Sequence, residues 1–223
     1  MEAMDIEKAR FNMIEQQVRP WDVLDQDILD SLALVKREDF VPPAYRGLAF
    51  ADVEIPLVRD GVRRGQVMFT PKVEARILQA LGVKRHESAL EIGTGSGYGT
   101  ALLAHRTRKV QSWEIDPALH DFASANLRRA GILDVRLHQG DGSTLPAEER
   151  FDVIILSGSV AEVPPEWLER LNEGGRLSAI VGDAPSMRAR IHTRVGNDWT
   201  TIDLFETVAA RLHGFPDSRR FRF

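Results

Sequence analysis

The 223-residue sequence contains no cysteine, which excludes a disulfide scaffold, a thiolate metal site and a cysteine nucleophile. It has no strong excess of charge: 29 Lys and Arg stand against 33 Asp and Glu, a formal net charge of −4, which is not the footprint of a nucleic-acid-binding protein. No apolar run reaches the ~18 residues that span a bilayer. The first residues are polar and acidic, unlike a signal peptide. We therefore expect a soluble, cytoplasmic protein that binds neither nucleic acid nor membrane.

The remaining composition is that of a folded globular protein. Hydrophobic residues make up 43% of the chain and charged residues 28%, which is enough to build a core. The length fits one large domain, or one domain of about 150 residues with an added piece. The six histidines show no metal-ligand spacing, so we expect no metal site. The sequence does not indicate an oligomeric state.

The first 69 residues are predicted to be helical and then irregular. Apolar residues recur at helical spacing between residues 6 and 18, and Pro20 ends that helix. A second short helix is expected after Asp27. Asp60-Gly61 lies between two apolar stretches, residues 55–58 and 66–69, which indicates a hairpin or a loop. The arginines of that loop, at positions 59, 63 and 64, either attract a carboxylate substrate or belong to a solvated loop.

From Thr70 onward, helical and strand patterns alternate. Thr70 before Pro71 is typical of an N-cap followed by Pro at the first helical position. Further helices are expected near residues 97–104, 117–130 and 166–171. Continuously apolar strands such as residues 153–156 are typical of a sheet covered on both faces. Seven strands are predicted, at residues 88–92, 110–113, 135–138, 151–156, 176–181, 191–195 and 199–205. The pattern predicts an α/β fold with a doubly wound, mostly parallel seven-stranded sheet, ending in an antiparallel hairpin.

A glycine-rich turn follows the first strand of this region. Gly93, Gly95 and Gly97 permit a sharp turn and close approach of a ligand to the main chain, and the next helix begins there with free N–H groups. A dinucleotide fingerprint requires glycine where Tyr98 stands, so an NAD-dependent dehydrogenase is disfavoured. With Glu91 two residues ahead, the pattern matches the S-adenosylmethionine loop of class I methyltransferases better. The alternative is a tight turn without a ligand.

Further polar residues follow the other strands. Glu114 ends the second strand, where a carboxylate can accept hydrogen bonds from ribose hydroxyls; the alternative is a helix-capping acid, a role that Asp116 fits better. Asp141 follows the third strand, where it can accept from the exocyclic amine of adenine, or serve as a turn residue. Ser157 follows the fourth strand. Because open α/β sheets bind ligands at the carboxyl ends of their strands, these positions together favour ligand binding.

With these residues placed, the chain resembles the protein-L-isoaspartate O-methyltransferase family over nearly its whole length. Two blocks are more specific to this family than the glycine loop: Arg-Glu-Asp-Phe-Val-Pro at residues 37–42, and Gly65-Gln66 with Pro71. The other matching blocks are residues 13–19, 35–36, 49–52, 55–57, 90–98, 140–142 and 174–177.

The resemblance implies a Rossmann-like class I methyltransferase core at residues 70–223. It implies that residues 1–69 cover the cofactor and substrate site. The implied reaction is methyl esterification of the carboxylate of L-isoaspartyl residues in damaged protein, with S-adenosylmethionine as donor and S-adenosylhomocysteine as product. The implied cofactor-binding residues are Glu91, Gly93, Thr94, Gly95, Ser96, Gly97, Tyr98, Glu114, Ile115, Asp141, Gly142 and Ser157.

One departure from the family pattern concerns the substrate side. After Gly-Gln the family carries a Thr-x-Ser that lines the methyl-transfer site, but Val67 and Phe69 occupy these positions here. Gln66, Phe69 and Thr70 are the expected substrate wall, although Thr70 is a poor replacement for the serine if it caps a helix. The departure leaves two alternatives open: a methyltransferase of the same fold with another acceptor, or a non-catalytic protein that binds the cofactor.

Overall fold

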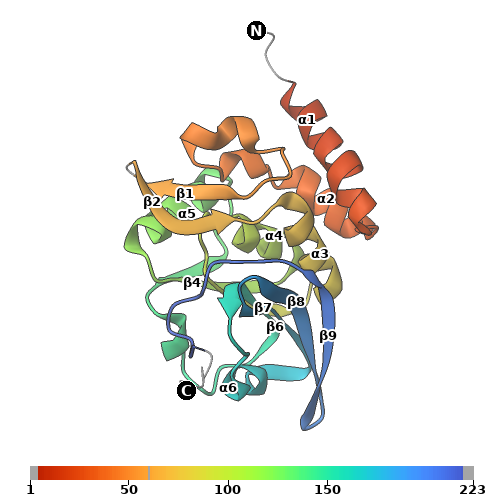
Figure 1. The fold of residues 1–223 in the computed structure, drawn as a ribbon, viewed down its shortest axis with the longest axis vertical. Helices are drawn as coiled ribbons and strands as arrows, with labels where there is room; N and C mark the ends of the chain where they lie inside the picture. The colour runs from red at the N-terminus through yellow and green to blue at the C-terminus, as the bar shows by residue number, and fades with distance from the viewer. Residues whose placement is uncertain (1–4, 60, 218–223) are drawn as a thin grey trace.

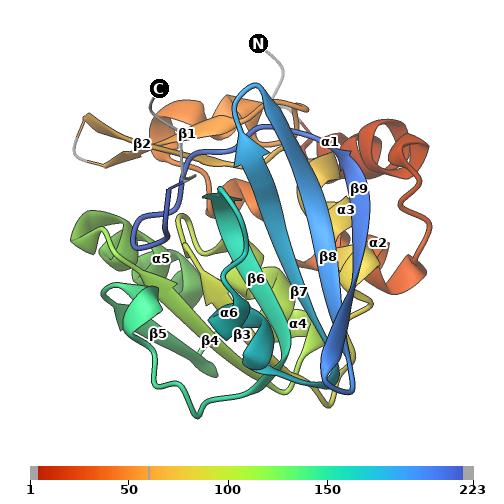
Figure 2. The same ribbon diagram turned by 60° about the horizontal axis from the view of Figure 1, so that its bottom comes forward.

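A computed structural model describes residues 5–59 and 61–217, without the side chains of Arg59, Arg63 and Arg64. Asp60 therefore lies outside the described part. So do the three arginine side chains that were considered as attracting a carboxylate substrate. Figure 1 shows the fold. Within the described part, seven strands form one sheet in the order β5-β4-β3-β6-β7-β8-β9, which Figure 2 labels from left to right. Pairs within β5-β4-β3-β6-β7 are parallel, and β8 and β9 are added antiparallel. The strands are β3 (Ser88–Ile92), β4 (Lys109–Glu114), β5 (Val135–Gln139), β6 (Phe151–Val160), β7 (Leu171–Asp183), β8 (Ser186–Val195) and β9 (Asp198–Glu206). The predicted fold class is confirmed.

Helices cover both faces of this sheet unequally. One face carries α3 (Pro71–Leu81), α4 (Tyr98–Arg106) and α5 (Pro117–Arg129), and the other carries the short α6 (Pro165–Glu169). Along β3, Ala89 joins the core under the three helices, while Leu90 joins the core under α6. Successive residues of one strand thus feed opposite cores, which explains the continuously apolar strands.

The N-terminal segment packs on the same side as the three helices. It contains α1 (Ile6–Met13) and α2 (Gln26–Leu34), whose buried side chains share the larger core. Asp25 caps α2, so this helix starts just before Asp27 rather than after it. The first helix continues past Met13 as a π-helical turn, a detail that periodicity did not predict. The short helical turns of the N-terminal segment are η1 (Ile14–Val18), η2 (Arg19–Trp21), η3 (Arg37–Asp39) and η4 (Pro43–Leu48).

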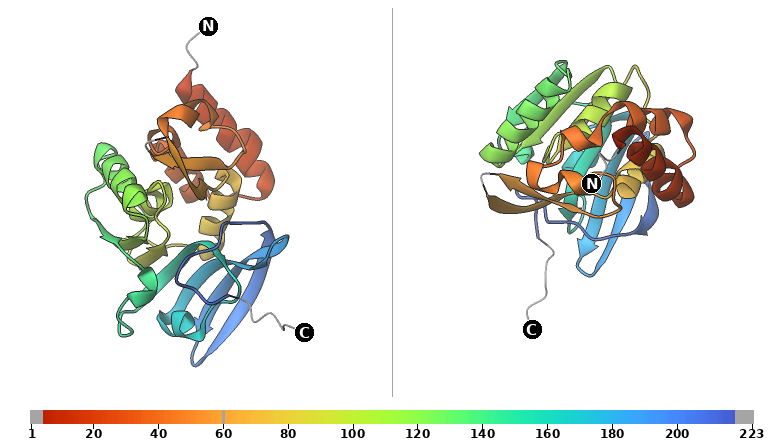
Figure 3. Two further views of the ribbon diagram at one scale, coloured as in Figure 1. Left: turned by 60° about the vertical axis from the view of Figure 1, so that its left-hand side comes forward. Right: turned by 90° about the horizontal axis from the view of Figure 1, so that it is seen from above.

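The predicted hairpin of the N-terminal segment is present as β1 (Ile55–Arg59) and β2 (Val62–Met68). It lies over the glycine loop, because a Cβ added at Gly95 would be 3.1 Å from Leu57 Cδ1. Figure 3 shows the orange N-terminal segment and hairpin above the strand ends of the main sheet. The hairpin therefore covers the edge at which α/β sheets bind ligands.

The chain after β9 returns across the same edge. Ser159 of β6 donates from its N–H to the Ala210 carbonyl at 2.7 Å and accepts from the Leu212 N–H at 2.9 Å, which makes a parallel bridge to Arg211. Figure 2 shows this dark blue segment running between the β1–β2 hairpin and the strand ends. The sequence pattern predicted the β8–β9 hairpin but not this return.

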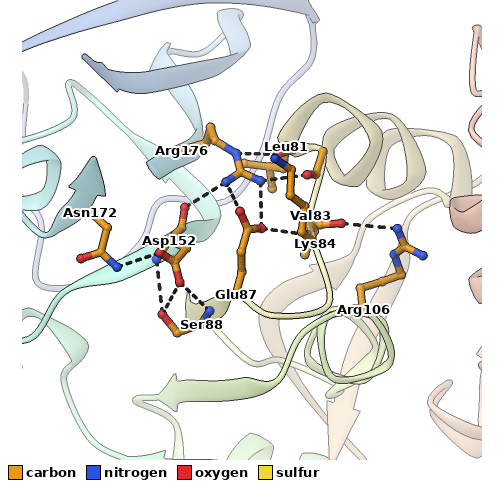
Figure 4. A network of polar contacts seen from close by, with 10 residues as sticks. Leu81, Val83, Lys84, Glu87, Ser88, Arg106, Asp152, Asn172 and Arg176 are labelled. Carbon is orange, nitrogen blue, oxygen red and sulfur yellow. Dashed lines mark hydrogen bonds and ion pairs between the residues drawn. The ribbon is translucent and has the colours of Figure 1, made fainter. Parts of the chain in front are cut away.

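A polar network stabilises the opposite, amino-terminal edge of the sheet (Figure 4). Arg176 forms hydrogen bonds with both carboxylate oxygens of Glu87, at 2.7 and 3.1 Å, and Asp152 accepts from Ser88 and Asn172. Burial acts to raise the pKa of Glu87, but the hydrogen bonds from Arg176 and the Lys84 N–H outweigh it and lower the pKa. This network is structural and lies away from the ligand-binding edge.

In the described part of the chain, the helices are too short or too polar to cross a bilayer.

Candidate functional site

A cavity of about 690 Å³, open to solvent, lies at the carboxyl ends of β3, β4, β5 and β6. Its position is the one at which open α/β sheets bind ligands. Strand ends, the β1–β2 hairpin and the C-terminal segment all contribute to its wall. The lining residues are Leu57, Gln66, Val67, Phe69, Ile92, Gly93, Gly95, Trp113, Glu114, Ile115, Gly140, Asp141, Gly142, Ser157, Gly158, Ala210, Arg211, Leu212 and His213.

Most of the residues proposed from the sequence come together here. Gln66, Phe69, Gly93, Gly95, Glu114, Ile115, Asp141, Gly142 and Ser157 line the main cavity. Glu91, Thr94, Ser96 and Tyr98 line a smaller neighbouring cavity that shares Phe69 and Ser157 with the first. Thr70 and Gly97 line neither cavity. Gly97 instead begins α4 with a φ of +85° and packs against α5.

Hydrogen bonds tie the glycine loop to the end of β4. The N–H of Gly93 donates to the Trp113 carbonyl at 2.9 Å, and the N–H of Gly95 donates to Glu114 Oε2 at 2.8 Å. These two loop donors are therefore occupied by protein acceptors. At the start of α4, where free N–H groups were predicted, the Tyr98 N–H lies 3.3 Å from Ser96 Oγ. Gly93 has a φ of +94° and a Cβ there would meet Leu212 at 3.2 Å, so both conformation and space require glycine.

Glu91 is a buried carboxylate held by three hydroxyl groups. Its Oε1 accepts from Ser157 at 2.9 Å, and its Oε2 accepts from Ser112 at 2.9 Å and from Thr100. Burial raises the pKa of Glu91 to about 7, against the hydrogen bonds that lower it. Near neutral pH the group therefore exists in both charged and neutral forms and favours a cationic neighbour.

Glu114 lies at the end of β4, as predicted, and each of its oxygens accepts one backbone hydrogen bond. The donors are the N–H groups of Gly95 and Asp116. Burial raises the pKa of Glu114. A carboxylate has about four acceptor positions, so both oxygens can accept a further hydrogen bond from the cavity. The helix-capping role belongs to Asp116, which accepts from the Ala118 N–H.

The structure confirms the turn role considered for Asp141. Its Oδ1 accepts from the Ser143 N–H at 2.9 Å and caps the short turn η5 (Gly142–Thr144). The same residue lines the cavity. A Cβ added at Gly214 would be 2.5 Å from Asp141 Oδ1, so the C-terminal segment passes directly over this carboxylate. Asp141 therefore presents a fixed acceptor to the cavity.

Thr70 precedes α3 at the N-cap position, but its hydroxyl makes no capping bond. Its Oγ1 is buried and finds no partner within the described residues. The predicted N-cap is thus correct in position and wrong in its hydrogen bond. The neighbouring Phe69 is held through its backbone, because Arg37 Nη2 donates to its carbonyl oxygen at 2.7 Å.

Sequence reasoning missed several residues that line the cavities, among them two groups that approach from α3 and from the C-terminal segment. Glu74 of α3 approaches Glu91 where Gly99 leaves space: a Cβ at Gly99 would be 2.6 Å from Glu91 Oε1 and 3.1 Å from Glu74 Oε1. Burial raises the pKa of Glu74 to about 7, and the Glu91 charge adds to this while Arg37 opposes it. The second group is Ala210–His213, which only the bridge to Ser159 brings to the cavity. The sequence signal that could have indicated the approach of Glu74 to Glu91 was the glycine at position 99, close to the glycine loop.

Comparison with known proteins decides the family. The model of the protein-L-isoaspartate(D-aspartate) O-methyltransferase family matches residues 8–209. A protein-L-isoaspartate O-methyltransferase of Methanoculleus marisnigri is 36% identical over 183 residues, covering 82% of this chain and 81% of the relative. This chain belongs to the protein-L-isoaspartate O-methyltransferase family.

Solved structures agree with this family assignment at the level of the fold. A protein-L-isoaspartate O-methyltransferase structure superposes with a TM-score of 0.76 at 24% identity, covering 92% of this chain and 65% of that one. A putative Plasmodium falciparum protein-L-isoaspartate O-methyltransferase, solved in complex with S-adenosyl-L-homocysteine, gives a TM-score of 0.75 at 19% identity. It covers 92% of this chain and 97% of that one. The described residues of this family member contain no group of three or more His, Cys, Asp or Glu side chains that could hold a metal ion.

Proposed function

We propose that this protein transfers the methyl group of S-adenosylmethionine to the carboxylate of L-isoaspartyl residues in damaged proteins. The observation that carries the proposal is the family match over residues 8–209, together with the cavity that the family's glycine loop borders. The products are a methyl ester and S-adenosylhomocysteine: an oxygen–methyl bond forms while the sulfur–methyl bond breaks.

The polar groups of the cavity fit this donor. Glu114 keeps acceptor capacity that would serve the two ribose hydroxyls, and Asp141 and Gly142, which line the cavity, would border adenine. Glu91 and residues 93–98 would hold the methionine end, where a buried carboxylate with three hydroxyl partners suits an ammonium group. The fully buried Tyr98, whose pKa burial raises, contributes packing under this loop rather than charge.

The chemistry makes few demands on the protein side chains. S-adenosylmethionine supplies a methyl group that is already activated by its sulfonium. An aspartyl carboxylate ordinarily titrates with a pKa of about 3.9 and is ionised at neutral pH, so it needs no general base. The task of the protein is alignment of the two partners, for which effective molarities allow roughly 7–11 kcal/mol. The β1–β2 hairpin and the C-terminal segment, which both contribute to the cavity wall, suit that task.

We also propose a division of labour along the chain. Residues 1–69 would act as a cover over the cofactor and substrate, and residues 70–223 as the catalytic core. The contacts of Leu57 with Gly95 and of Asn126 with the carbonyls of Phe40 and Ser96 support this arrangement. We propose the cytoplasm as the place of action, which fractionation of cells that produce the protein would test.

A second candidate function is methyl transfer to another acceptor. Phe69 favours it, because a large apolar ring borders both cavities where the family pattern has a serine hydroxyl. A flatter, more apolar acceptor would pack better against this ring than a carboxylate.

The test is methyl transfer from labelled S-adenosylmethionine to an isoaspartyl peptide, with the normal aspartyl peptide as control. Base-labile methyl ester on the isoaspartyl peptide alone supports the proposal. Tight cofactor binding without ester on that peptide would contradict it and favour the second candidate. Calorimetry on the same samples supplies the binding measurement.

A further inference from the structure

Phe69 leaves the acceptor side of the cavity without the hydroxyl that the family pattern places there. Among the residues that line the main cavity, acidic groups are present at Glu114 and Asp141, but these occupy the proposed nucleoside side. The one Arg or Lys among the lining residues is Arg211. An anionic substrate needs a hydrogen-bond donor or a cation near the transferred methyl group. The contacts of Arg211 decide whether its guanidinium can serve as that group.

Arg211 is held in a fixed backbone position. Hydrogen bonds on both sides join its neighbours Ala210 and Leu212 to Ser159 of β6. Leu212 packs into the space left by two glycines: a Cβ would meet it at 2.8 Å from Gly158 and at 3.2 Å from Gly93. The C-terminal segment is therefore fixed at the edge of the cavity. Figure 2 shows this dark blue segment crossing the strand ends of the sheet.

The guanidinium of Arg211 uses only part of its hydrogen-bonding capacity. Its Nη2 donates to Asp183 Oδ1 at the end of β7. Its Nη1 is shielded from water and finds no acceptor within the described residues. A charged donor in this condition is unfavourable, and a carboxylate that reaches the guanidinium would relieve it. The side chain is 28% exposed, so part of it is accessible to a ligand.

The forked guanidinium is also the group that best matches a carboxylate. Arginine can donate to both oxygens at once, and such charge-assisted bonds are stronger than a neutral hydroxyl bond. A fixed arginine can thus replace the binding energy of a missing serine hydroxyl. Phe69 would then line the side of the isoaspartyl residue rather than contact its charge.

We propose that Arg211 binds the methyl-accepting carboxylate of the substrate and so determines specificity for a carboxylate over a carboxamide. This inference rests on the proposed function. It differs from a purely structural role, in which Arg211 only ties the C-terminal segment to Asp183.

The experiment measures binding to the full chain saturated with S-adenosylhomocysteine, so that no methyl transfer takes place. Three peptides are titrated by calorimetry: one with isoaspartate, its counterpart with the free carboxylate replaced by carboxamide, and the normal aspartyl peptide. The readout is the ratio of the carboxamide and isoaspartyl dissociation constants. A structural role for Arg211 would change both constants together and leave this ratio unchanged.

The wild-type protein should prefer the carboxylate peptide by tenfold or more, the size of a charge-assisted hydrogen bond. Arg211→Met should bring the ratio close to one, and Arg211→Lys should restore part of it. The matched control is Arg190→Met, because Arg190 also pairs with an aspartate, Asp203, but does not line the cavity. This control should keep the wild-type ratio.

A wild-type ratio in Arg211→Met would overturn the inference while leaving the proposed function intact. If the wild-type protein binds the isoaspartyl peptide no better than the aspartyl peptide, the proposed function and this inference both fail. Should Arg211→Met not bind S-adenosylhomocysteine, Asp183→Asn decides. Release of Nη2 from the Asp183 charge should raise the ratio, and an unchanged ratio would overturn the inference.

Discussion

Arg37 Nη2 donates a hydrogen bond of 2.7 Å to the carbonyl oxygen of Phe69. The same fully buried guanidinium donates to the Ala49 carbonyl and pairs with Glu74 at 3.3 Å. Its carbon lies 5.1 Å from the centre of the Tyr98 ring. One side chain therefore connects the N-terminal segment, the end of the β1–β2 hairpin, α3 and α4, and it fixes the backbone of the residue that borders both cavities.

The first prediction concerns this connection. Arg37→Met should lower the free energy of unfolding by about 3–5 kcal/mol, because it leaves buried acceptors and the Glu74 carboxylate without their donor. Urea denaturation measures the change. Arg46→Met is the control, because Arg46 lies exposed in η4 and should change stability by less than about 0.5 kcal/mol. Equal effects of the two substitutions would show that Arg37 does not tie these elements together.

The second prediction concerns the position of the missing hydroxyl. Phe69→Ser should raise kcat/KM for an isoaspartyl peptide by about 10- to 100-fold, since a hydroxyl bond to a carboxylate contributes about 1.5–3 kcal/mol. Phe69→Ala removes the ring without adding the hydroxyl, and should give a smaller gain. Unchanged or lower activity of Phe69→Ser would indicate that the pocket serves another acceptor. Peptide methylation rates provide the comparison.

Much of this site follows from local sequence. The run of apolar residues in β3, the glycine spacing after it, and the acids that end β4 and follow β5 are short-range signals, and parallel pairing brings strand ends to one edge. The cap position at Thr70 was equally local. Its hydroxyl makes no bond because capping depends on side-chain orientation, which the pattern does not specify.

Contacts between distant segments could not be predicted in this way. Arg211 reaches the cavity through a bridge to Ser159, far earlier in the chain, and no residue type in the C-terminal segment signals that pairing. The approach of Glu74 to Glu91 depends on the space at Gly99 and on the packing of α3 against α4. The hydrogen bond from the Gly95 N–H to Glu114 also joins two segments, and no local pattern predicts it.

The third prediction concerns pH. Burial raises the pKa of both Glu74 and Glu91 from 4.5 to about 7, so the folded state binds more protons than the unfolded state between these values. Stability should therefore fall as pH rises from about 4.5 to about 7, by on the order of 1–3 kcal/mol per group, and should level off above that range. Glu74→Gln should make the free energy of unfolding less dependent on pH, as measured by urea denaturation at about pH 5, 6, 7 and 8. The exposed Glu162→Gln is the control, and a dependence that stays steep in Glu74→Gln would refute the assignment.

The fourth prediction concerns the proposed ribose contact. Glu114→Gln should weaken S-adenosylhomocysteine binding by roughly tenfold or more, because the amide offers one oxygen where two backbone N–H groups and two hydroxyls need acceptors. Calorimetry measures the dissociation constant, and thermal unfolding shows that the variant is folded. Asp121→Asn, at an exposed position of α5, should bind like the wild type. Wild-type affinity in Glu114→Gln would exclude the ribose role.

The proposed function requires that this protein esterify isoaspartyl residues even though Phe69 borders the cavity where the family pattern has serine. A competition experiment mixes the isoaspartyl peptide and its aspartyl counterpart, made distinguishable by an isotope label, in one reaction with S-adenosylmethionine. Mass spectrometry then reports which peptide gains the mass of one methyl group. We expect methyl ester on the isoaspartyl peptide alone, lost again in base. Methylation of both peptides at equal rates, or of neither while the cofactor binds, would refute the proposed function.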